Sequence, residues 1–524
     1  MLRASQGQRR GADRRLRRAH RAGAGAAGGR GGLCDDRRRE LRVGRGRAAL
    51  LCTVLLLLGA CAEEPTASTV AAGREAALLA ALLDEEVPSQ EAALREIETA
   101  GDERFIAPLI ELVRAGQLGI AGRNGYNQRI VTLERLSGQN LGGDWFGWAE
   151  WYGATELSAP PGFASWKGRL LSELDPAYAS FLTDEAPSRI RVEEIDWGGV
   201  PVDGIPPLEH PEHVPASEAA HMEDGEPVFG VAAGGARRAY PLRVLDWHEL
   251  ANDRLGGVPL SLAYCTLCGS GIAYDGRLPG REEPLDFGTS GFLYRSNKLM
   301  YDRATRTLWN QLTGRPVFGS LAADDLELRL LPAVVTTWGE WKTRHPDTTV
   351  LTLNTGHDRP YQLGEPYGSY FASEQKLFPV AESRKEQASK ERIFGLSRGG
   401  VAKAWTLSSL VEEKVVNDQL GELALVLVAA DGRIEVEGYT RRSGPVRYDA
   451  GGAVRAYASP GATFRLGPDE ETLLDADGAR WKIGEEALLG PDGKRAPRVP
   501  GTLAYWFAWQ AFHPQTGLYP PPEG

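Results

Sequence analysis

An internal repeat constrains this chain more than any other feature of its sequence. Segments of the second half of the chain repeat earlier segments, in the same order and about 165 residues later. Leu250-Ala-Asn-Asp-Arg-Leu-Gly, for example, corresponds to Val415-Val-Asn-Asp-Gln-Leu-Gly. Self-similarity at a fixed offset is the sequence signature of a duplicated structural unit. We therefore expect two homologous β-rich modules, which span residues 216–380 and 385–520.

Both copies continue in the same way after the shared Asn-Asp pair. Each runs into an apolar strand, and each ends on a tryptophan-rich helix that is followed by His-Pro, at His345 and His513. Tyr274-Asp-Gly and Ala430-Asp-Gly are typical of hairpin turns. Because both copies keep the tryptophans and histidines, we expect these residues to serve folding rather than catalysis.

The region before the repeat has a different pattern. Residues 62–137 place apolar side chains at helical spacing and contain one helix pair of the HEAT type. Residues 138–215 are rich in Pro, Gly and Trp, which indicates a long wrapping connection, because flexible linkers are not aromatic. The predicted fold class is therefore α+β, with a small all-α region before the two modules. We expect this helical region to be where an envelope protein partner binds.

The N-terminus carries an export signal. Residues 43–61 combine a basic start with a short apolar run that ends in Leu58-Gly-Ala-Cys61. This ending resembles the lipobox of bacterial lipoproteins, and the resemblance implies that Cys61 is lipidated and begins the mature chain. A plain signal peptide with a chance cysteine is the alternative. Residues 1–42 precede the signal, and we interpret them as the result of a start codon assigned too early.

The charge distribution limits the class of partner. Of the 60 Lys and Arg residues, 15 lie in residues 1–61, whereas only 4 of the 70 Asp and Glu residues do, so the remainder carries a formal charge of −21. Phosphate backbones repel such a surface, which makes nucleic acid an unsuitable partner. The expected protein is exported and held to the cell membrane or outer membrane by its lipid, facing the periplasm or the exterior.

The repeat also separates residues that both copies need from residues that only one copy has. His248, Cys265 and Cys268 occur in the first copy alone. At the positions of His248 and Cys265 the second copy has Glu413 and Ala430, and it contains no cysteine. Since the second copy lacks all three residues, they are candidates for chemistry.

Three interpretations fit these residues, and the first, a metal site, is favoured because it explains why His248 accompanies the two cysteines. Two thiolates and an imidazole suit a copper or zinc ion, and Met300 would add a thioether that favours copper. Cys265 and Cys268 would alternatively form a redox pair, with one thiol activated by its surroundings. A ligand- or partner-binding scaffold without catalysis is the third interpretation. Covalent haem does not fit, because Gly269 rather than His follows Cys268, and no fingerprint for a nucleotide cofactor is present.

Several motifs together resemble a bacterial and archaeal family known as domain of unknown function 3179. They include Trp247-His-Glu, Tyr264-Cys-Thr-Leu-Cys-Gly, Phe287-Gly-Thr-Ser-Gly and Leu308-Trp-Asn-Gln, and the resemblance covers residues from about 200 to 520. Thr266 stands where the family usually has Pro. The resemblance implies one site around His248 and the two cysteines, lined by Tyr294, Asn297, Asp302 and Arg303. It implies no activity, so the choice between enzyme and scaffold stays open.

Overall fold

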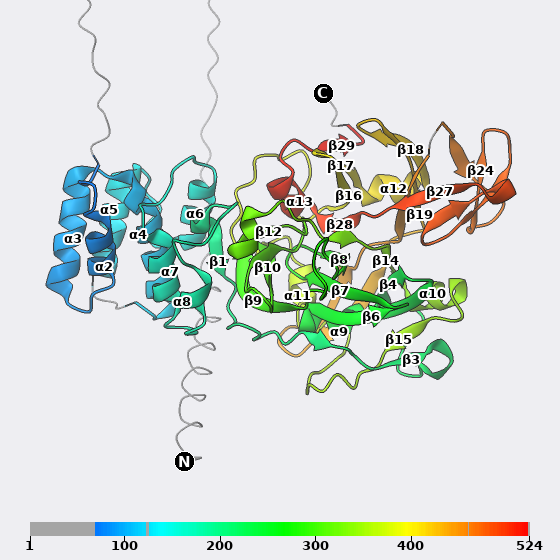
Figure 1. Ribbon diagram of the computed structural model, residues 1–524, viewed down its shortest axis with the longest axis horizontal. Helices are drawn as coiled ribbons and strands as arrows, with labels where there is room; N and C mark the ends of the chain where they lie inside the picture. The colour runs from blue at the N-terminus through cyan, green and yellow to red at the C-terminus, as the bar shows by residue number, and fades with distance from the viewer. Residues whose placement is uncertain (1–68, 122–124, 460, 522–524) are drawn as a thin grey trace, which may run out of the picture.

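The structure is a computed structural model that describes residues 69–121, 125–459 and 461–521. Residues 1–42, the predicted signal peptide and the predicted lipidation site Cys61 lie outside the described residues. Within the described ranges, no helix is long and apolar enough to cross a membrane. Figure 1 shows the helical region at one end of the molecule and the β-rich part at the other.

The helical region is built around one buried helix. Its helices are α2 (Glu75–Leu82), α3 (Val87–Ala100), α4 (Ile106–Leu118), α5 (Tyr126–Ser137), α6 (Trp145–Gly153), α7 (Phe163–Leu171) and α8 (Tyr178–Phe181). Most residues of α4 are buried, which is expected for a helix with neighbours on several sides. Trp148 and Phe163 belong to the same core, and this explains why α6 and α7 form within residues 138–215, where the sequence predicts a connection.

The first module contains three five-stranded sheets, in the orders β14-β4-β5-β15-β3, β13-β8-β7-β6-β2 and β1-β9-β10-β11-β12. Strand β1 comes from the segment that links the helices to this module, and it pairs antiparallel with β9. The strands are β1 (Ile195–Trp197), β2 (Leu208–Glu209), β3 (His213–Pro215), β4 (Pro227–Ala233), β5 (Ala236–Pro241), β6 (Leu250–Leu255), β7 (Val258–Cys265), β8 (Ser270–Asp275), β9 (Phe287–Tyr294), β10 (Asn297–Asp302), β11 (Leu308–Asn310), β12 (Pro316–Phe318), β13 (Arg329–Leu330), β14 (Ala333–Thr337) and β15 (Thr349–Leu351). Its helices are α9 (Leu242–His248), α10 (Trp338–Arg344) and the short α11 (Gly368–Phe371), which lies in the segment before the second module.

The second module has a four-stranded sheet, β28-β16-β17-β29, and an eight-stranded sheet, β18-β19-β22-β27-β26-β25-β24-β23. The hairpin β20-β21 stands apart as a two-stranded sheet. The elements are β16 (Arg392–Arg398), β17 (Val401–Thr406), α12 (Leu407–Glu413), β18 (Val415–Leu420), β19 (Leu423–Ala429), β20 (Glu435–Thr440), β21 (Gly444–Asp449), β22 (Val454–Ala458), β23 (Phe464–Leu466), β24 (Thr472–Asp475), β25 (Arg480–Ile483), β26 (Ala487–Leu489), β27 (Arg495–Val499), β28 (Thr502–Tyr505), α13 (Trp506–Phe512) and β29 (Gly517–Tyr519).

The two modules share a topology. The order β14-β4-β5-β15 in the first module matches β28-β16-β17-β29 in the second. The pairing directions match as well: β4 is antiparallel to β14 and β5, and β15 is parallel to β5, just as β16 is antiparallel to β28 and β17, and β29 is parallel to β17. The predicted α+β fold class, with its duplication, is confirmed.

The same side-chain bonds recur in both modules. The indole of Trp309 donates to Asp302 Oδ2 at 3.0 Å, and that of Trp481 donates to Asp475 Oδ2 at 2.9 Å. The second tryptophan of each tryptophan-rich helix donates its indole N–H to a threonine that follows the His-Pro corner. Trp341 donates to Thr348 at 2.8 Å, and Trp509 donates to Thr516 at 2.9 Å. These residues hold the fold in each copy, as the repeat predicts.

The two modules form one body. A single hydrophobic core contains Phe229 and Tyr264 of the first module together with Phe394 and Trp405 of the second. The backbone N–H of Tyr505 donates to the carbonyl of Cys268 at 2.8 Å, so β28 of the second module lies against the β7–β8 turn of the first. This contact brings the second module to the cysteines.

Candidate functional site

The two cysteines form the turn of a β-hairpin. Cys265 ends β7 and pairs with Ser270, the first residue of β8. The N–H of Cys268 donates to the carbonyl of Cys265 at 3.2 Å, which closes the turn. Gly269 follows with φ +59°, and a Cβ atom there would lie 2.9 Å from Arg392 and 3.1 Å from Tyr505. A glycine is therefore required directly after the second cysteine.

Both thiols are free and buried, and they meet the turn of a second hairpin. Cys265 and Cys268 are 1% and 0% exposed. The carbonyl of Ser296, in the β9–β10 turn, accepts from the sulfur of Cys268 at 3.4 Å and from that of Cys265 at 4.0 Å. The side-chain amide of Asn297 donates to the sulfur of Cys268 at 3.3 Å. Two tight turns thus hold the thiols between them.

The surroundings make the two thiols unequal. Burial raises the pKa of the Cys265 thiol, but hydrogen bonds from the Cys268 thiol and the backbone N–H of Lys298 outweigh it and leave this pKa below its ordinary value. Burial and donation to Cys265 raise the pKa of Cys268 well above its ordinary value. The thiolate is the nucleophilic form of cysteine, so the directions of the two pKa shifts favour Cys265 as the nucleophile of the pair.

An apolar and aromatic shell from both modules covers the thiols. Leu293, Tyr370, Phe507 and Ala508 pack with them in one buried cluster. Phe507 and Ala508 lie on α13, the tryptophan-rich helix of the second module. The helix of one module therefore closes the thiol site of the other.

A buried ion pair separates the thiols from a cavity. Lys298 Nζ lies 3.3 Å from Glu249 Oε2, and the two residues are 4% and 8% exposed. Thr266, which follows Cys265, donates to Glu249 Oε1 at 3.0 Å. Glu249 ends α9 with φ +55°, a left-handed conformation that turns it towards β7 rather than along the helix. The ion pair is thus connected to the thiols in two ways. Thr266, next to Cys265, bonds to Glu249, and the backbone N–H of Lys298 bonds to Cys265.

The cavity has a volume of about 300 Å³, which lies within the usual range for small-molecule sites. Leu267, Glu249 and Lys298 form the wall next to the cysteines. The other walls come from α4, the Trp197–Val200 segment, strands β9 and β10, and residues 377–378. The helical region and the linking segment thus help to shape a cavity beside the thiols.

His248 lies elsewhere, contrary to the prediction that it joins the cysteines. Its Nδ1 is 2.7 Å from the carbonyl of Pro206, so Nδ1 carries the hydrogen, and Nε2 accepts from the hydroxyl of Tyr361 at 2.6 Å. Burial lowers the pKa of His248 to about 4. Both ring nitrogens are engaged away from the thiols. Among the described residues, no group of three or more His, Cys, Asp or Glu side chains is arranged to hold a metal ion.

Of the other predicted residues, only Asn297 contacts the thiols. Met300 lies in a hydrophobic core with Trp309, apart from the cluster that contains the cysteines. Tyr294 packs against Phe512, with ring centroids 5.9 Å apart. Asp302 accepts the indole N–H of Trp309 and the hydroxyl of Thr305, which is a structural role. Arg303 forms ion pairs with Asp203 at 3.0 Å and with Glu209 at 3.1 Å.

Three contributors to the site were missed from the sequence: Glu249, Lys298 and the Ser296 carbonyl. For Glu249 a signal exists, because the repeat places Lys414 at its position in the second copy. A position with opposite charges in the two copies is one where the copies differ in their electrostatics as well as in their packing. Lys298 and Ser296 carry no such signal, since the second copy has shorter strands and a longer turn in its β23–β24 hairpin, which stands in place of the β9–β10 hairpin.

Comparisons with known proteins give one relationship. The family model described as protein of unknown function (DUF3179) matches residues 202–516, which covers the first module and nearly all of the second. No curated protein and no solved structure is significantly similar to the chain. The match spans more than half of the sequence and contains the thiol pair, and the chain therefore belongs to the DUF3179 family.

Proposed function

We propose that this protein is a lipid-anchored thiol–disulfide redox protein of the cell envelope, with Cys265 and Cys268 as its reactive pair. The observation that carries the proposal is the arrangement of the two thiols. They are free, lie in one turn beside the same Ser296 carbonyl, and have environments that move their pKa values in opposite directions. Such a difference is what a dithiol needs in order to supply one nucleophile and one resolving thiol.

The proposed reaction is an exchange with a disulfide. The Cys265 thiolate attacks one sulfur of the partner disulfide, a mixed disulfide forms, and one partner sulfur leaves as a thiolate. Cys268 then loses its proton and attacks Cys265 Sγ, which releases the second partner thiolate. Two electrons and two protons pass to the partner, which becomes a dithiol or two thiols, while Cys265 and Cys268 become a disulfide. The reverse sequence oxidises a dithiol.

The cavity beside Leu267 is the proposed route to the thiols. Both thiols are buried, so a partner sulfur reaches them only where the wall formed by Leu267, Glu249 and Lys298 opens. A cavity of about 300 Å³ suits a small disulfide or an extended peptide segment better than a folded surface. Helix α4 of the helical region lines the cavity. An envelope protein bound to the helical region would therefore insert such a segment into the cavity along α4.

A copper or zinc centre is supported less well. Two sulfurs remain as ligands once His248 is bonded to Pro206 and Tyr361. Structural zinc sites usually have four protein ligands. The geometry therefore favours redox chemistry, and metal binding becomes an outcome of the same experiment.

The experiment is a redox titration of the purified chain. The protein is reduced, equilibrated in glutathione buffers of graded potential, and alkylated, and the mass of the peptide with Cys265 and Cys268 is measured. We expect one reversible two-electron transition that is lost in Cys265→Ser and Cys268→Ser. Failure to form a reversible disulfide, together with stoichiometric copper or zinc lost in both variants, would establish the metal site instead. If neither is found, the pair is structural.

A further inference from the structure

A second and larger cavity lies between the modules. It has a volume of about 600 Å³. Its walls are α10 of the first module and, from the second module, the end of β19, strand β22 and the β23–β24 turn. The linings of this cavity and of the cavity beside Cys265 have no described residue in common, so the two are separate compartments.

This cavity occupies the position in the second module that the thiol site occupies in the first. At the repeat offset of 165, Lys414 corresponds to Glu249 and Ala430 to Cys265, and Lys414 and Ala430 both line the larger cavity. Lys414 has φ +63° and Glu249 φ +55°, so both residues end their helices in the left-handed conformation. The two sites are therefore built on equivalent parts of the repeated fold.

The opposite module closes both sites with its tryptophan-rich helix. Phe507 and Phe512 of α13 belong to, or pack against, the cluster that contains the thiols. Aligned through the shared tryptophans, the equivalent residues of α10 are Gly339 and Arg344, and both line the larger cavity. A glycine thus removes one aromatic ring of the first site, and a guanidinium group replaces the other. The duplication retained the position of a site and replaced its lining.

The new lining contains three buried donor atoms that lack a hydrogen-bond partner. Arg344 Nε, Arg455 Nη2 and Thr472 Oγ1 are buried, and none of them makes a hydrogen bond within the described part of the chain. Arg455 is 4% exposed, and its Nη2 lies 2.9 Å from Glu485 Oε1 as an ion pair, in a direction that makes no hydrogen bond. Buried polar atoms without a partner are rare in folded proteins. Since guanidinium and hydroxyl groups are donors, these three atoms point to a ligand that accepts hydrogen bonds.

Positive charge is in surplus where the lining is least exposed. Arg455 and, behind the lining, Arg498 share the carboxylate of Glu485, with N–O distances of 2.9 Å and 3.5 Å. Arg344 is half-buried, donates to the carbonyl of Ile483 at 3.0 Å and has no ion pair among the described residues. One buried carboxylate therefore faces three guanidinium groups.

The acidic residues of the lining do not remove this surplus. Glu340 is half-buried, accepts from the hydroxyl of Thr336 and offsets one guanidinium charge only. Asp431 is already paired with Lys414 at 2.7 Å. The acids at positions 469–471 are exposed in the β23–β24 turn, where water screens their charge. The inner wall of the cavity is therefore positive, whereas its exposed edge is acidic.

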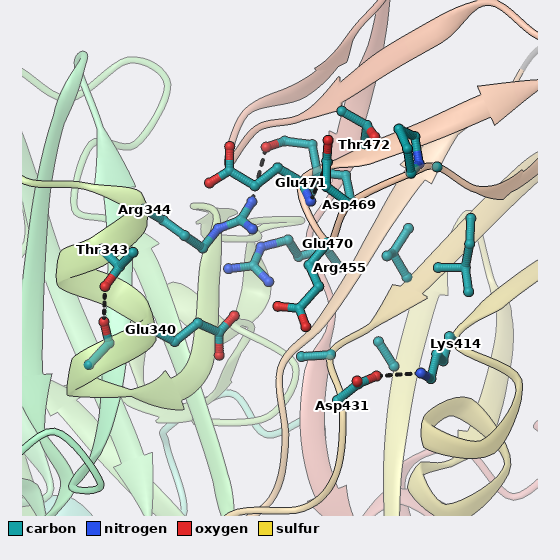
Figure 2. A pocket seen from close by; sticks show the side chains of 18 residues that line it. Glu340, Thr343, Arg344, Lys414, Asp431, Arg455, Asp469, Glu470, Glu471 and Thr472 are labelled. Carbon is teal, nitrogen blue, oxygen red and sulfur yellow. Dashed lines mark hydrogen bonds and ion pairs between the residues drawn. The ribbon is translucent and has the colours of Figure 1, made fainter.

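The two guanidinium groups of the lining face one another. Figure 2 shows Arg344 on α10 and Arg455 on β22 extending towards each other from opposite walls. Burial raises the pKa of Tyr457, whereas Arg498, Arg455 and Arg344 all lower it, so the three positive charges act on one region. Like charges that face each other repel, and an anionic group between them replaces this repulsion by attraction.

We propose that this cavity binds a small organic carboxylate with an apolar body. Its carboxylate lies between Arg344 and Arg455 and accepts the hydrogen bonds that their guanidinium groups lack, because the planar fork of arginine matches a carboxylate. Its body packs on Val428, Ala429 and Ile483, which line the same cavity. The volume of about 600 Å³ lies within the range of sites for such molecules. A phosphate monoester fits less well, because the acidic edge repels its second charge.

The test is calorimetric titration of the full chain with hexanoate at constant ionic strength. Hexanamide and hexylamine, which have a similar body with no charge or with a positive charge, are titrated beside it. We expect saturable binding of hexanoate alone. Arg344→Gln should weaken this binding about tenfold, as the loss of a hydrogen bond to a charged group does. Glu340→Gln should strengthen it, because Glu340 lies on the same helix as Arg344, lines the cavity and repels an anion. Arg281→Gln, an exposed arginine outside the cavity, is the matched control and should have no effect.

Three results would overturn the proposal. Absence of hexanoate binding is the first. The second is equal binding of hexanamide or hexylamine, which would show that the cavity does not recognise the carboxylate. The third is an equal effect of Arg344→Gln and Arg281→Gln, or weaker binding in Glu340→Gln, because hexanoate would then bind elsewhere. Circular dichroism and the melting temperature show whether Arg344→Gln retains the fold, and a gain of affinity in Glu340→Gln cannot result from unfolding.

Discussion

The side-chain amide of Asn297 donates a hydrogen bond to the sulfur of Cys268 at 3.3 Å and a second one to Gln311 at 2.9 Å. The first bond favours the thiolate of Cys268 and lowers its pKa, against the larger effect of burial. Asn297 is therefore a positioning residue for the thiol that resolves the mixed disulfide. The hydrogen bond from Asn297 to Cys268 affects the redox potential of the thiol pair. A role of Asn297 in packing alone would leave that potential unchanged, so a measurement of the potential separates the two roles.

The first prediction is that Asn297→Ala makes the disulfide harder to reduce. Removal of a bond that stabilises the reduced pair by about 1 kcal/mol lowers the potential by roughly 20 mV. The glutathione titration measures the shift. Asn354→Ala, which removes an exposed amide bonded to Glu212, is the control and should leave the potential unchanged. A potential equal to that of the wild type would assign Asn297 a packing role alone.

The second prediction concerns the hydrogen bond between the thiols. The Cys268 thiol donates to Cys265 and helps to hold the Cys265 pKa below its ordinary value. Cys268→Ala removes the donor, so the pH at which Cys265 reacts with iodoacetamide should rise. Cys268→Ser retains a donor and should raise it less. The rate of alkylation between pH 5 and pH 10 gives both values, and identical profiles would contradict the proposed bond.

The third prediction links His248 to stability. Its pKa is lowered to about 4 in the folded chain, against about 6.5 in an unfolded one. Between these values the unfolded chain binds the extra proton, so stability is complete above pH 6.5 and falls by about 3 kcal/mol as the pH decreases to 4. Urea unfolding at pH 5 and pH 7.5 measures this loss. His248→Gln should reduce the difference between the two pH values, and an unchanged difference would show that other groups cause it.

The fourth prediction uses two glycines that lie under the paired tryptophans. A Cβ atom on Gly230 would lie 2.2 Å from the ring of Trp341, and one on Gly395 would lie 2.5 Å from that of Trp509. Each Gly→Ala change should therefore destabilise the chain by about 1–3 kcal/mol through overpacking. Gly225→Ala, which meets no atom within 4 Å, is the control. Equal stability of all three variants would contradict the packing of these helices.

The fifth prediction tests export and the anchor. A chain expressed from Val43 should appear in the membrane fraction and incorporate a lipid label, and Cys61→Ala should abolish both. The variant should lose its membrane attachment because the apolar run before Cys61 is too short to span a bilayer, so the attachment depends on the lipid. Wild-type protein that stays unlabelled in the cytosol would refute the proposed location.

The repeat could be read from the sequence because identical residues make identical bonds. Asn252 bonds both backbone groups of Phe287, and Asn417 does the same with Phe464. A residue fixed by such bonds changes slowly, so it remains visible in both copies. The duplicated fold was therefore predictable. The tight β9–β10 turn was not, because the second copy has a longer turn between β23 and β24, and the β20–β21 hairpin was not, because such a separate two-stranded sheet is described in the second module only.

The composition of the site was harder to predict because neighbours in sequence need not point the same way. His248 and Glu249 are adjacent, but α9 ends between them, and the left-handed Glu249 turns towards β7 while His248 bonds to Pro206. On β10, Asn297 donates to the sulfur of Cys268, but the pairing with β9 shifts register between Lys298 and Met300, and Met300 packs in a separate core with Trp309. Only one of the two contacts the thiols.

The exchange of tryptophan-rich helices has a consequence for how this chain can change. A symmetric dimer of identical chains must carry two identical sites, because any substitution appears in both. Here the two halves are joined, and α13 covers the thiols while α10 covers their counterpart. Each half is free to vary its own lining, yet neither can be deleted, since the survivor would lose the lid that the other supplies. One polypeptide thus holds two unlike compartments on a frame that began as two like ones.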